Sequence, residues 1–161
     1  MRFDKKIEIN IFDFFKYGKF GYIKLDQTKE WVLNNFPDAD SQYENKPFDI
    51  LKYGNIEFHF HKNILFLIFC EEFDNFNGGK SLIIDKWILE KPNELKLLNV
   101  LEKLNENNID YEKKEDSLGI KLKLESGVEL TFENINDIEN LNKNHYELTT
   151  FGLYNKEILE I

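Results

Sequence analysis

Residues 52–72, KYGNIEFHFHKNILFLIFCEE, decide the fold that we expect for this chain. Between positions 56 and 61 apolar and polar residues alternate strictly, which is typical of a strand with one buried face. The buried face would carry Ile56, Phe58 and Phe60, and the other face Glu57, His59 and His61. The run 64–70 is apolar throughout and predicts a second strand that is covered on both faces, in the interior of a sheet.

The connection between these two strands allows two registers. A three-residue loop places Phe58 opposite Phe66, whereas a two-residue loop places Phe58 opposite Leu67. We expect the first, because it pairs aromatic side chains.

The rest of the chain adds helices and strands on both sides of this hairpin. Asn10 and Gly18 fit the two ends of a short helix, and Asp26 fits the start of a second helix that Pro37 ends. Leu97, Leu98, Leu101 and Leu104 repeat at helical spacing after Pro92. The pattern predicts helices at 11–17, 27–36 and 92–107, strands at 81–89, 109–113 and 145–154, and a hairpin at 119–133. It predicts a loop at 41–47 and an exposed acidic loop or short helix at 134–144.

The register of the hairpin at 119–133 follows from its own alternation. A three-residue loop, 125–127, sets Leu122 opposite Leu130 and keeps all apolar side chains on one face. A two-residue loop would oppose Leu124 to Glu129, so we reject it and expect Gly127 in the left-handed conformation.

This order of elements predicts an α+β fold. We expect an antiparallel sheet of about six to eight strands, in two halves that each run from helix to meander, with the helices packed on one face. The length of 161 residues suits a single domain, 1–161, in which halves 1–90 and 91–161 could share the sheet.

The charge is strongly negative and unevenly placed. The formal net charge is -9, and residues 81–161 hold 10 of the basic and 17 of the acidic side chains. The segment 124–142 has no Lys or Arg but contains Glu125, Glu129, Glu133, Asp137 and Glu139. Such a field repels nucleic acid and anionic membranes and attracts cationic partners, although ordinary solubility also explains acidic domains.

No segment indicates secretion or membrane insertion. The N-terminus lacks the apolar core of a signal peptide, and no apolar run approaches the length of a spanning helix. The single cysteine, Cys70, excludes an internal disulfide and lies within an apolar run, where we expect an inert thiol. We therefore expect a cytoplasmic protein.

The histidines offer the main candidate chemistry. His59 and His61 share a strand face and could supply two metal ligands or a general base, with Glu57 or His145 as a further ligand. Polar residues on the solvent side of a sheet would give the same pattern. No closely spaced cysteine or other histidine completes a metal site, so we expect no cofactor and no catalytic residues.

Three segments together resemble a pattern of small bacterial proteins. They are ²³IKLDQTKEWV³², ³⁵NFPD³⁸ and ⁵³YGNIEF⁵⁸, against the pattern LGxTxxxV…LGxPD…YGxLxFxF, whose two glycines are Asp26 and Phe36 here. The pattern is similar to the helix-then-sheet unit of the β-lactamase-inhibitor-protein fold, to small outer-membrane assembly lipoproteins, and to cytosolic proteins that look like immunity proteins of toxin systems. The resemblance implies a fold used for binding proteins.

The sequence thus predicts an acidic, non-enzymatic protein-binding domain. We expect an immunity protein that neutralises a basic bacterial toxin, for example a nuclease, by occluding its active site. The predicted contact residues are Glu125, Glu129, Glu133, Asp137 and Glu139, with Tyr146 and Tyr154 as anchors. The alternatives are a metal-dependent hydrolase that uses the His59 and His61 face, or a structural domain without a catalytic site.

Overall fold

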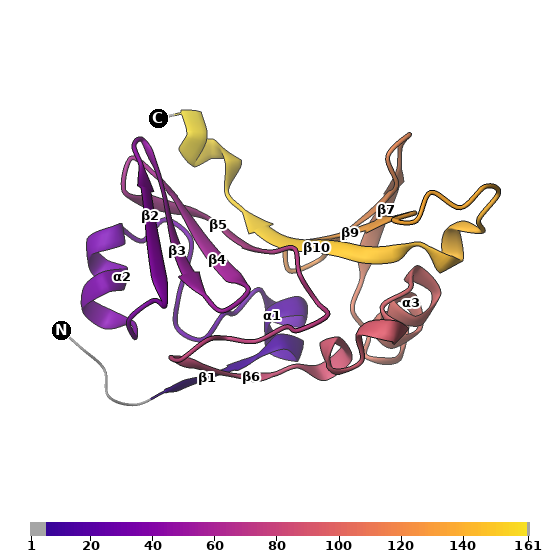
Figure 1. Ribbon diagram of the computed structural model, residues 1–161, viewed down its shortest axis with the longest axis horizontal. Helices are drawn as coiled ribbons and strands as arrows, with labels where there is room; N and C mark the ends of the chain where they lie inside the picture. Colours follow the sequence, from indigo (N-terminus) through magenta and orange to yellow (C-terminus); the bar gives the residue numbers. More distant parts are fainter. Residues whose placement is uncertain (1–5, 161) are drawn as a thin grey trace.

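A single eight-stranded antiparallel sheet forms the centre of the protein (Figure 1). The computed structural model describes residues 6–160. The strands lie in the order β2-β3-β4-β5-β10-β9-β8-β7, so two meanders meet at β5 and β10. Their bounds are β2 Ser41–Asn45, β3 Phe48–Tyr53, β4 Ile56–His61, β5 Ile64–Cys70, β7 Tyr111–Glu115, β8 Ile120–Leu124, β9 Val128–Glu133 and β10 Glu147–Tyr154. The predicted α+β fold, with two halves that each run from helix to meander, is confirmed.

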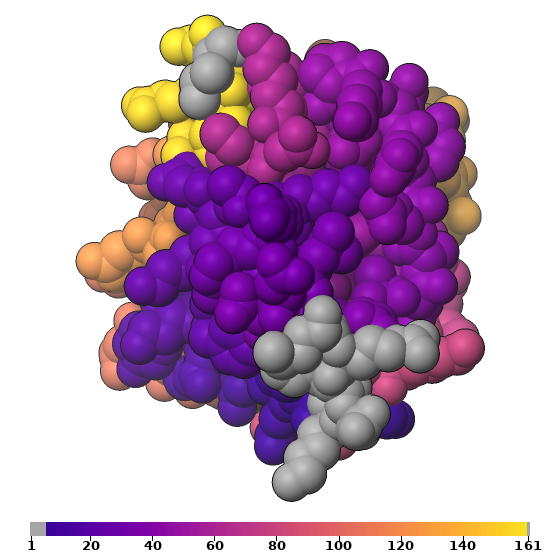
Figure 2. All heavy atoms as spheres, turned by 90° about the vertical axis from the view of Figure 1, so that its left-hand side faces the viewer, coloured from indigo at the N-terminus to yellow at the C-terminus, as the bar shows by residue number. Residues whose placement is uncertain are grey.

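Three α-helices cover one face of the sheet, as predicted. They are α1 Ile11–Tyr17, α2 Lys29–Asn35 and α3 Leu97–Glu106. Figure 2 shows the side on which α2 lies, where residues of the first half, indigo to magenta, form most of the surface and residues of the second half, orange to yellow, lie along its edges. Among residues 6–160 no helix is long and apolar enough to cross a membrane.

Local hydrogen bonds explain where the first two helices begin and end. The Asn10 Oδ1 accepts a hydrogen bond from the Asp13 N–H at 3.0 Å, and Gly18 ends α1 in the left-handed region at φ 70°. The start predicted for the second helix is wrong: Asp26 has φ 78°, and Thr28 caps α2 by accepting from the Trp31 N–H at 3.0 Å. The hydroxyl satisfies an N–H that the helix leaves unpaired.

The core beneath the sheet is rich in aromatic rings. Phe14 of α1 packs edge-on against Phe20 and Phe151, with ring centroids 5.3 and 5.4 Å apart. Phe58 of β4 lies 5.6 Å from Phe20 and 5.7 Å from Phe36. All five rings are fully buried, so helices of the first half and a strand of the second half share one core. Of the leucines predicted to form the apolar face of α3, Leu97 and Leu104 are buried, whereas Leu98 is 43% exposed.

The strand β5 is covered on both faces, as its apolar run predicts. Leu65, Ile68 and Cys70 belong to the main core. On the opposite face Phe66 and Leu67 pack against Ile158 of the 3₁₀ helix η4, Lys156–Glu160. Figure 1 shows this C-terminal segment on the side of β5 away from α1.

Two predicted strand assignments need correction. The expected strand at 81–89 is shorter, since β6 spans Leu82–Asp85 and continues into the 3₁₀ helix η1 Trp87–Glu90. It pairs in parallel with β1, Ile7–Asn10, in a separate two-stranded sheet. The expected loop at 41–47 contains β2, which pairs with β3. The remaining 3₁₀ helices are η2 Pro92–Glu94 and η3 Lys143–His145.

Of the two predicted hairpin registers, that of β8–β9 is confirmed and that of β4–β5 is wrong. In β8–β9 Leu122 faces Leu130 and Gly127 has φ 97°, as predicted. In β4–β5 the three-residue loop is wrong: a two-residue turn, Lys62 and Asn63 with φ 48° and 65°, is followed by a bulge that sets Phe58 opposite Ile68. Positive φ at both positions is what a type I′ turn requires.

Candidate protein-interaction surface

The face of the sheet turned away from the three α-helices, here called the open face, carries charges of both signs. Its polar residues on β4, β8 and β9 are Glu57, His59, His61, Lys121, Lys123, Glu129, Thr131 and Glu133. The Lys121 Nζ lies 3.9 Å from the Glu129 Oε2. Lysines of β8 therefore stand beside the carboxylates of β9, and the middle of the open face is not uniformly acidic.

The five predicted acidic contacts do not form one surface. Glu125 lies in the turn between β8 and β9, and Glu133 ends β9 at the opposite end of that strand. Glu129 and Glu133 are four residues apart, or about 13 Å along the strand. Asp137 and Glu139 are exposed in the segment that follows β9. The structure thus gathers Glu133 with the exposed segment at one end of the sheet and leaves Glu125 at the other.

The two predicted aromatic anchors have different surroundings. Tyr146 is partly buried and packs against the main core, so it offers little free surface. Tyr154 is 37% exposed at the end of β10. Burial and the nearby charge of Glu129 raise the pKa of the Tyr154 hydroxyl, and the Lys156 Nζ lies 5.3 Å from the Tyr154 ring centroid.

A hollow lined by carboxylates lies where the two halves of the sheet meet. Its acidic residues are Glu71, Glu72 and Asp74, directly after β5, and Glu147, the first residue of β10. The hollow measures about 240 Å³, and no Lys or Arg lines it. None of the four carboxylates forms an ion pair within residues 6–160.

A second hollow of about 270 Å³ adjoins the first and shares Ile135 and Glu147 with it. Glu133 lines the second hollow and is the direct cross-strand partner of Glu147. Like charges that oppose each other across a sheet are destabilising. The only basic groups that line it are Lys96 and His145.

Two exposed isoleucines stand beside these carboxylates. Ile135 is 57% exposed and Ile138 is 49% exposed. Asn134 fixes their loop, because its Oδ1 accepts from the Ile138 N–H at 3.0 Å and its Nδ2 donates to the Ile138 carbonyl at 2.8 Å. We call the whole region the acidic end, defined by Glu71, Glu72, Asp74, Glu133, Ile135, Asp137, Ile138, Glu139 and Glu147.

Glu71, Glu72 and Asp74 are not among the contact residues predicted from the sequence. Their signal is the run EEFD directly after the apolar strand, where a change from buried to charged residues marks the point at which the chain leaves the sheet. Their proximity to Glu147 depends on the pairing of β5 with β10, which no local pattern shows.

The structure does not bring the candidate metal ligands together. The His59 Nε2 lies 2.9 Å from the Glu57 Oε1, but the His61 Nδ1 lies 3.2 Å from the Ile158 carbonyl oxygen. His145 lies in η3, next to the acidic end. Among residues 6–160 no group of three or more His, Cys, Asp or Glu side chains could hold a metal ion.

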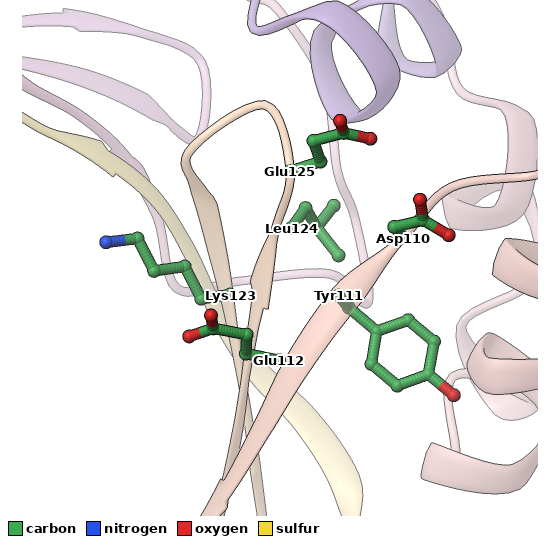
Figure 3. A pocket seen from close by; sticks show the side chains of 6 residues that line it. All are labelled: Asp110, Tyr111, Glu112, Lys123, Leu124 and Glu125. Atoms are coloured by element: carbon green, nitrogen blue, oxygen red, sulfur yellow. The ribbon is translucent and has the colours of Figure 1, made fainter.

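Cys70 and a third hollow also lack the geometry of a reaction site. Cys70 is fully buried, which raises the pKa of its thiol to about 12, and its Sγ lies 3.3 Å from a backbone oxygen. The hollow between β7 and β8 has a volume of about 390 Å³. Figure 3 shows that its side chains diverge, with Lys123 and Glu112 extending away from Tyr111. The six lining residues are Asp110, Tyr111, Glu112, Lys123, Leu124 and Glu125.

Comparisons with known proteins show a distant structural likeness. No family model and no curated protein matches the chain. Among solved structures, the chain is similar to a cysteine-rich secretory protein from Staphylococcus aureus, with 9% identity and a TM-score of 0.40. The match covers 96% of this chain and 52% of that one, so this chain spans about half the length of that protein. A likeness this distant has no bearing on function.

Proposed function

We propose that this chain is a non-enzymatic protein-binding domain whose acidic end binds a basic protein. The observation that carries the proposal is the unpaired charge there: Glu71, Glu72, Asp74 and Glu147 line one hollow without a Lys or Arg. Glu133 opposes Glu147 directly across the sheet. A cationic partner would offset this repulsion, so the acidic end gains more from such a partner than a surface of balanced charges does.

The acidic end also supplies apolar contacts. Charged residues steer association and select the partner, whereas buried apolar groups at the centre of an interface contribute much of the affinity. Ile135 and Ile138 lie among the carboxylates and are already ordered by Asn134. Exposed apolar side chains beside carboxylates fit a basic surface that has an apolar depression.

Immunity against a toxin is the form of this function that we propose. An enzyme that cleaves nucleic acid needs a cationic groove for phosphate, and carboxylates can occupy that groove in place of phosphate. The complex would prevent substrate access without any chemical step. Such a protein would act in the cytoplasm of the cell that makes the toxin.

Co-purification tests the proposal. The chain is co-expressed with the C-terminal domain of the protein encoded directly upstream, and gel filtration is run at low and high salt. We expect one stoichiometric complex that weakens at high salt, because the contact is electrostatic. Separate elution at both salt concentrations would contradict the proposal for that partner.

A matched pair of charge variants then tests the surface. The triple variant Glu71→Lys, Glu72→Lys and Glu147→Lys reverses the acidic end, and Glu8→Lys, Glu30→Lys and Glu157→Lys makes the same change of charge at exposed positions elsewhere. We expect the first variant to weaken binding at least about 100-fold, since each lost charge contact at an interface costs about 1 kcal/mol or more. Equal weakening in both variants would show that net charge, and not the acidic end, governs binding.

A further inference from the structure

The two edges of the eight-stranded sheet are protected very differently. The edge strand β7 has the sequence YEKKE, with charges at four of its five positions. Charged side chains, lysine above all, keep an exposed edge from pairing with another strand. The opposite edge strand, β2, has the sequence SQYEN, without Lys, Arg or Pro, and pairs with β3 in an unbroken register. All five residues of β2 are exposed.

The single charge on β2 is already paired within the chain. The Glu44 Oε1 accepts hydrogen bonds from the Gln42 Nε2 at 2.8 Å and from the Lys29 Nζ at 3.5 Å. A basic partner would therefore find no unpaired carboxylate here, unlike at the acidic end.

The sequence of β2 is complementary to itself when two copies run antiparallel. Pairing centred on Tyr43 places Gln42 opposite Glu44 of the second copy and Ser41 opposite Asn45, so no like charges oppose each other. On the open face, Tyr43 is 61% exposed beside its cross-strand neighbour Ile50. Phe48, opposite Asn45, is 46% exposed. Two copies would cover this apolar surface with an equivalent one.

We propose that β2 is a homodimer interface, in which two copies of the chain pair antiparallel about Tyr43 and join their sheets into one. The interface is independent of the proposed function, because β2 lies four strands from β10, or about 19 Å across the sheet. Both acidic ends stay open in the dimer. A five-residue strand buries less surface than a standard interface, so the dimer forms at high protein concentration.

Directed disulfide formation tests the register. In the proposed dimer two copies of residue 43 face each other with Cα atoms about 4.5 to 5.5 Å apart, within disulfide range. Residue 41 would lie about 14 Å from its own copy, beyond that range. Tyr43→Cys should therefore form a disulfide dimer under mild oxidation at least about tenfold faster than Ser41→Cys. Cys70 is buried and does not compete. Equal rates for the two variants would overturn the register.

The mass in solution tests the interface without a covalent bond. By sedimentation equilibrium up to about 1 mM we expect the average mass to rise from 19.3 kDa toward twice that value. Tyr43→Lys places two like charges face to face and should weaken the dimer at least about tenfold. Tyr17→Lys, which changes a tyrosine that is 57% exposed on α1, should leave the dimer unchanged. A monomeric wild type at 1 mM, or undiminished dimerisation of Tyr43→Lys, would overturn the proposal.

Discussion

Replacing Lys29 by methionine should destabilise the fold by about 3 to 5 kcal/mol, because it removes the partner of a buried carboxylate. Lys29 begins α2, and its Nζ lies 3.3 Å from the Asp49 Oδ2 and 3.5 Å from the Glu44 Oε1. The Asp49 side chain is 1% exposed, whereas that of Glu44 is 60% exposed. Water can therefore rehydrate Glu44 in the variant but not Asp49.

The magnitude follows from the hydrogen bonds of Asp49. Its Oδ1 is buried and has no hydrogen-bond partner within residues 6–160. The hydrogen bond that Lys29 donates to Oδ2 therefore offsets the cost of burying this carboxylate. Without Lys29 the carboxylate stays buried and unpaired, which is the costly way to break an ion pair. Loss of the ion pair between Lys29 and Glu44 should lower the free energy of unfolding by less than about 1 kcal/mol, because Glu44 is exposed.

Urea unfolding followed by tryptophan fluorescence measures the loss, and a thermal melt should show a midpoint lower by about 6 to 20 °C. The double variant Lys29→Met, Asp49→Leu should recover at least half of the loss, because it removes the unpaired carboxylate as well. Lys103→Met is the control, since Lys103 and Glu106 form an exposed pair at 3.4 Å. A loss below about 1 kcal/mol for Lys29→Met, or a double variant no more stable than the single one, would refute the reasoning.

Three further predictions concern single groups. Cys70, with its thiol pKa raised to about 12 by burial, should not react with a thiol reagent at pH 8 until the protein unfolds, as a colorimetric assay with and without urea would show. Hydrogen bonds from Lys143 and Lys113 lower the pKa of Glu115, so this pairing stabilises the fold above the unfolded pKa of Glu115 and is lost as the pH falls through the folded pKa. Lys143→Met should raise the pKa of Glu115 in an NMR titration. Gly54→Ala should cost about 2 kcal/mol or more in urea unfolding, against about 1 kcal/mol for Gly127→Ala. Both positions have positive φ, but a Cβ at position 54 would lie 2.3 Å from a backbone oxygen, whereas at position 127 its nearest contact is 3.3 Å.

The sequence predicted the parts of the fold in which one face is apolar and the other polar. Alternation in β8 and β9 excludes a register shifted by one residue, and the structure has the register predicted from the three-residue loop. In β5 both faces are apolar, so shifting the register of β5 against β4 by one residue still places apolar side chains on the buried face. The preference for pairing Phe58 with Phe66 was therefore a choice without a physical constraint, and the bulge after the turn decided the pairing.

Edge strands were the other source of error. All of β2 is exposed, so the sequence there has no apolar alternation and is typical of a loop. Its strand conformation comes from pairing with β3, a neighbour that the pattern of 41–45 alone does not indicate. The apolar segment around β6 was recognised, but its partner is β1, the strand directly before α1, and not a strand of the main sheet.

The sequence predicted the negative charge of the candidate site but not its position on the sheet. The absence of basic residues from 124 to 142 identified the acidic half, yet alternation puts Glu129 beside Lys121, which neutralises it locally. Charge summed along a chain does not distinguish a carboxylate that faces a lysine from one that faces another carboxylate. Glu133 and Glu147 are of the second kind, and only the pairing of β9 with β10 shows it.

The acidic end exists because the two halves of the chain share a sheet. Glu71, Glu72 and Asp74 follow β5, the last strand of the first meander, and Glu147 opens β10, which pairs with β5 in the centre of the sheet (Figure 1). Neither half alone collects these four carboxylates. If β5 and β10 separated, Glu147 would no longer share a hollow with Glu71, Glu72 and Asp74, and a basic partner would gain less by binding. A partner that binds the acidic end therefore binds the joined sheet, and by linkage it stabilises the β5–β10 pairing that creates its own site.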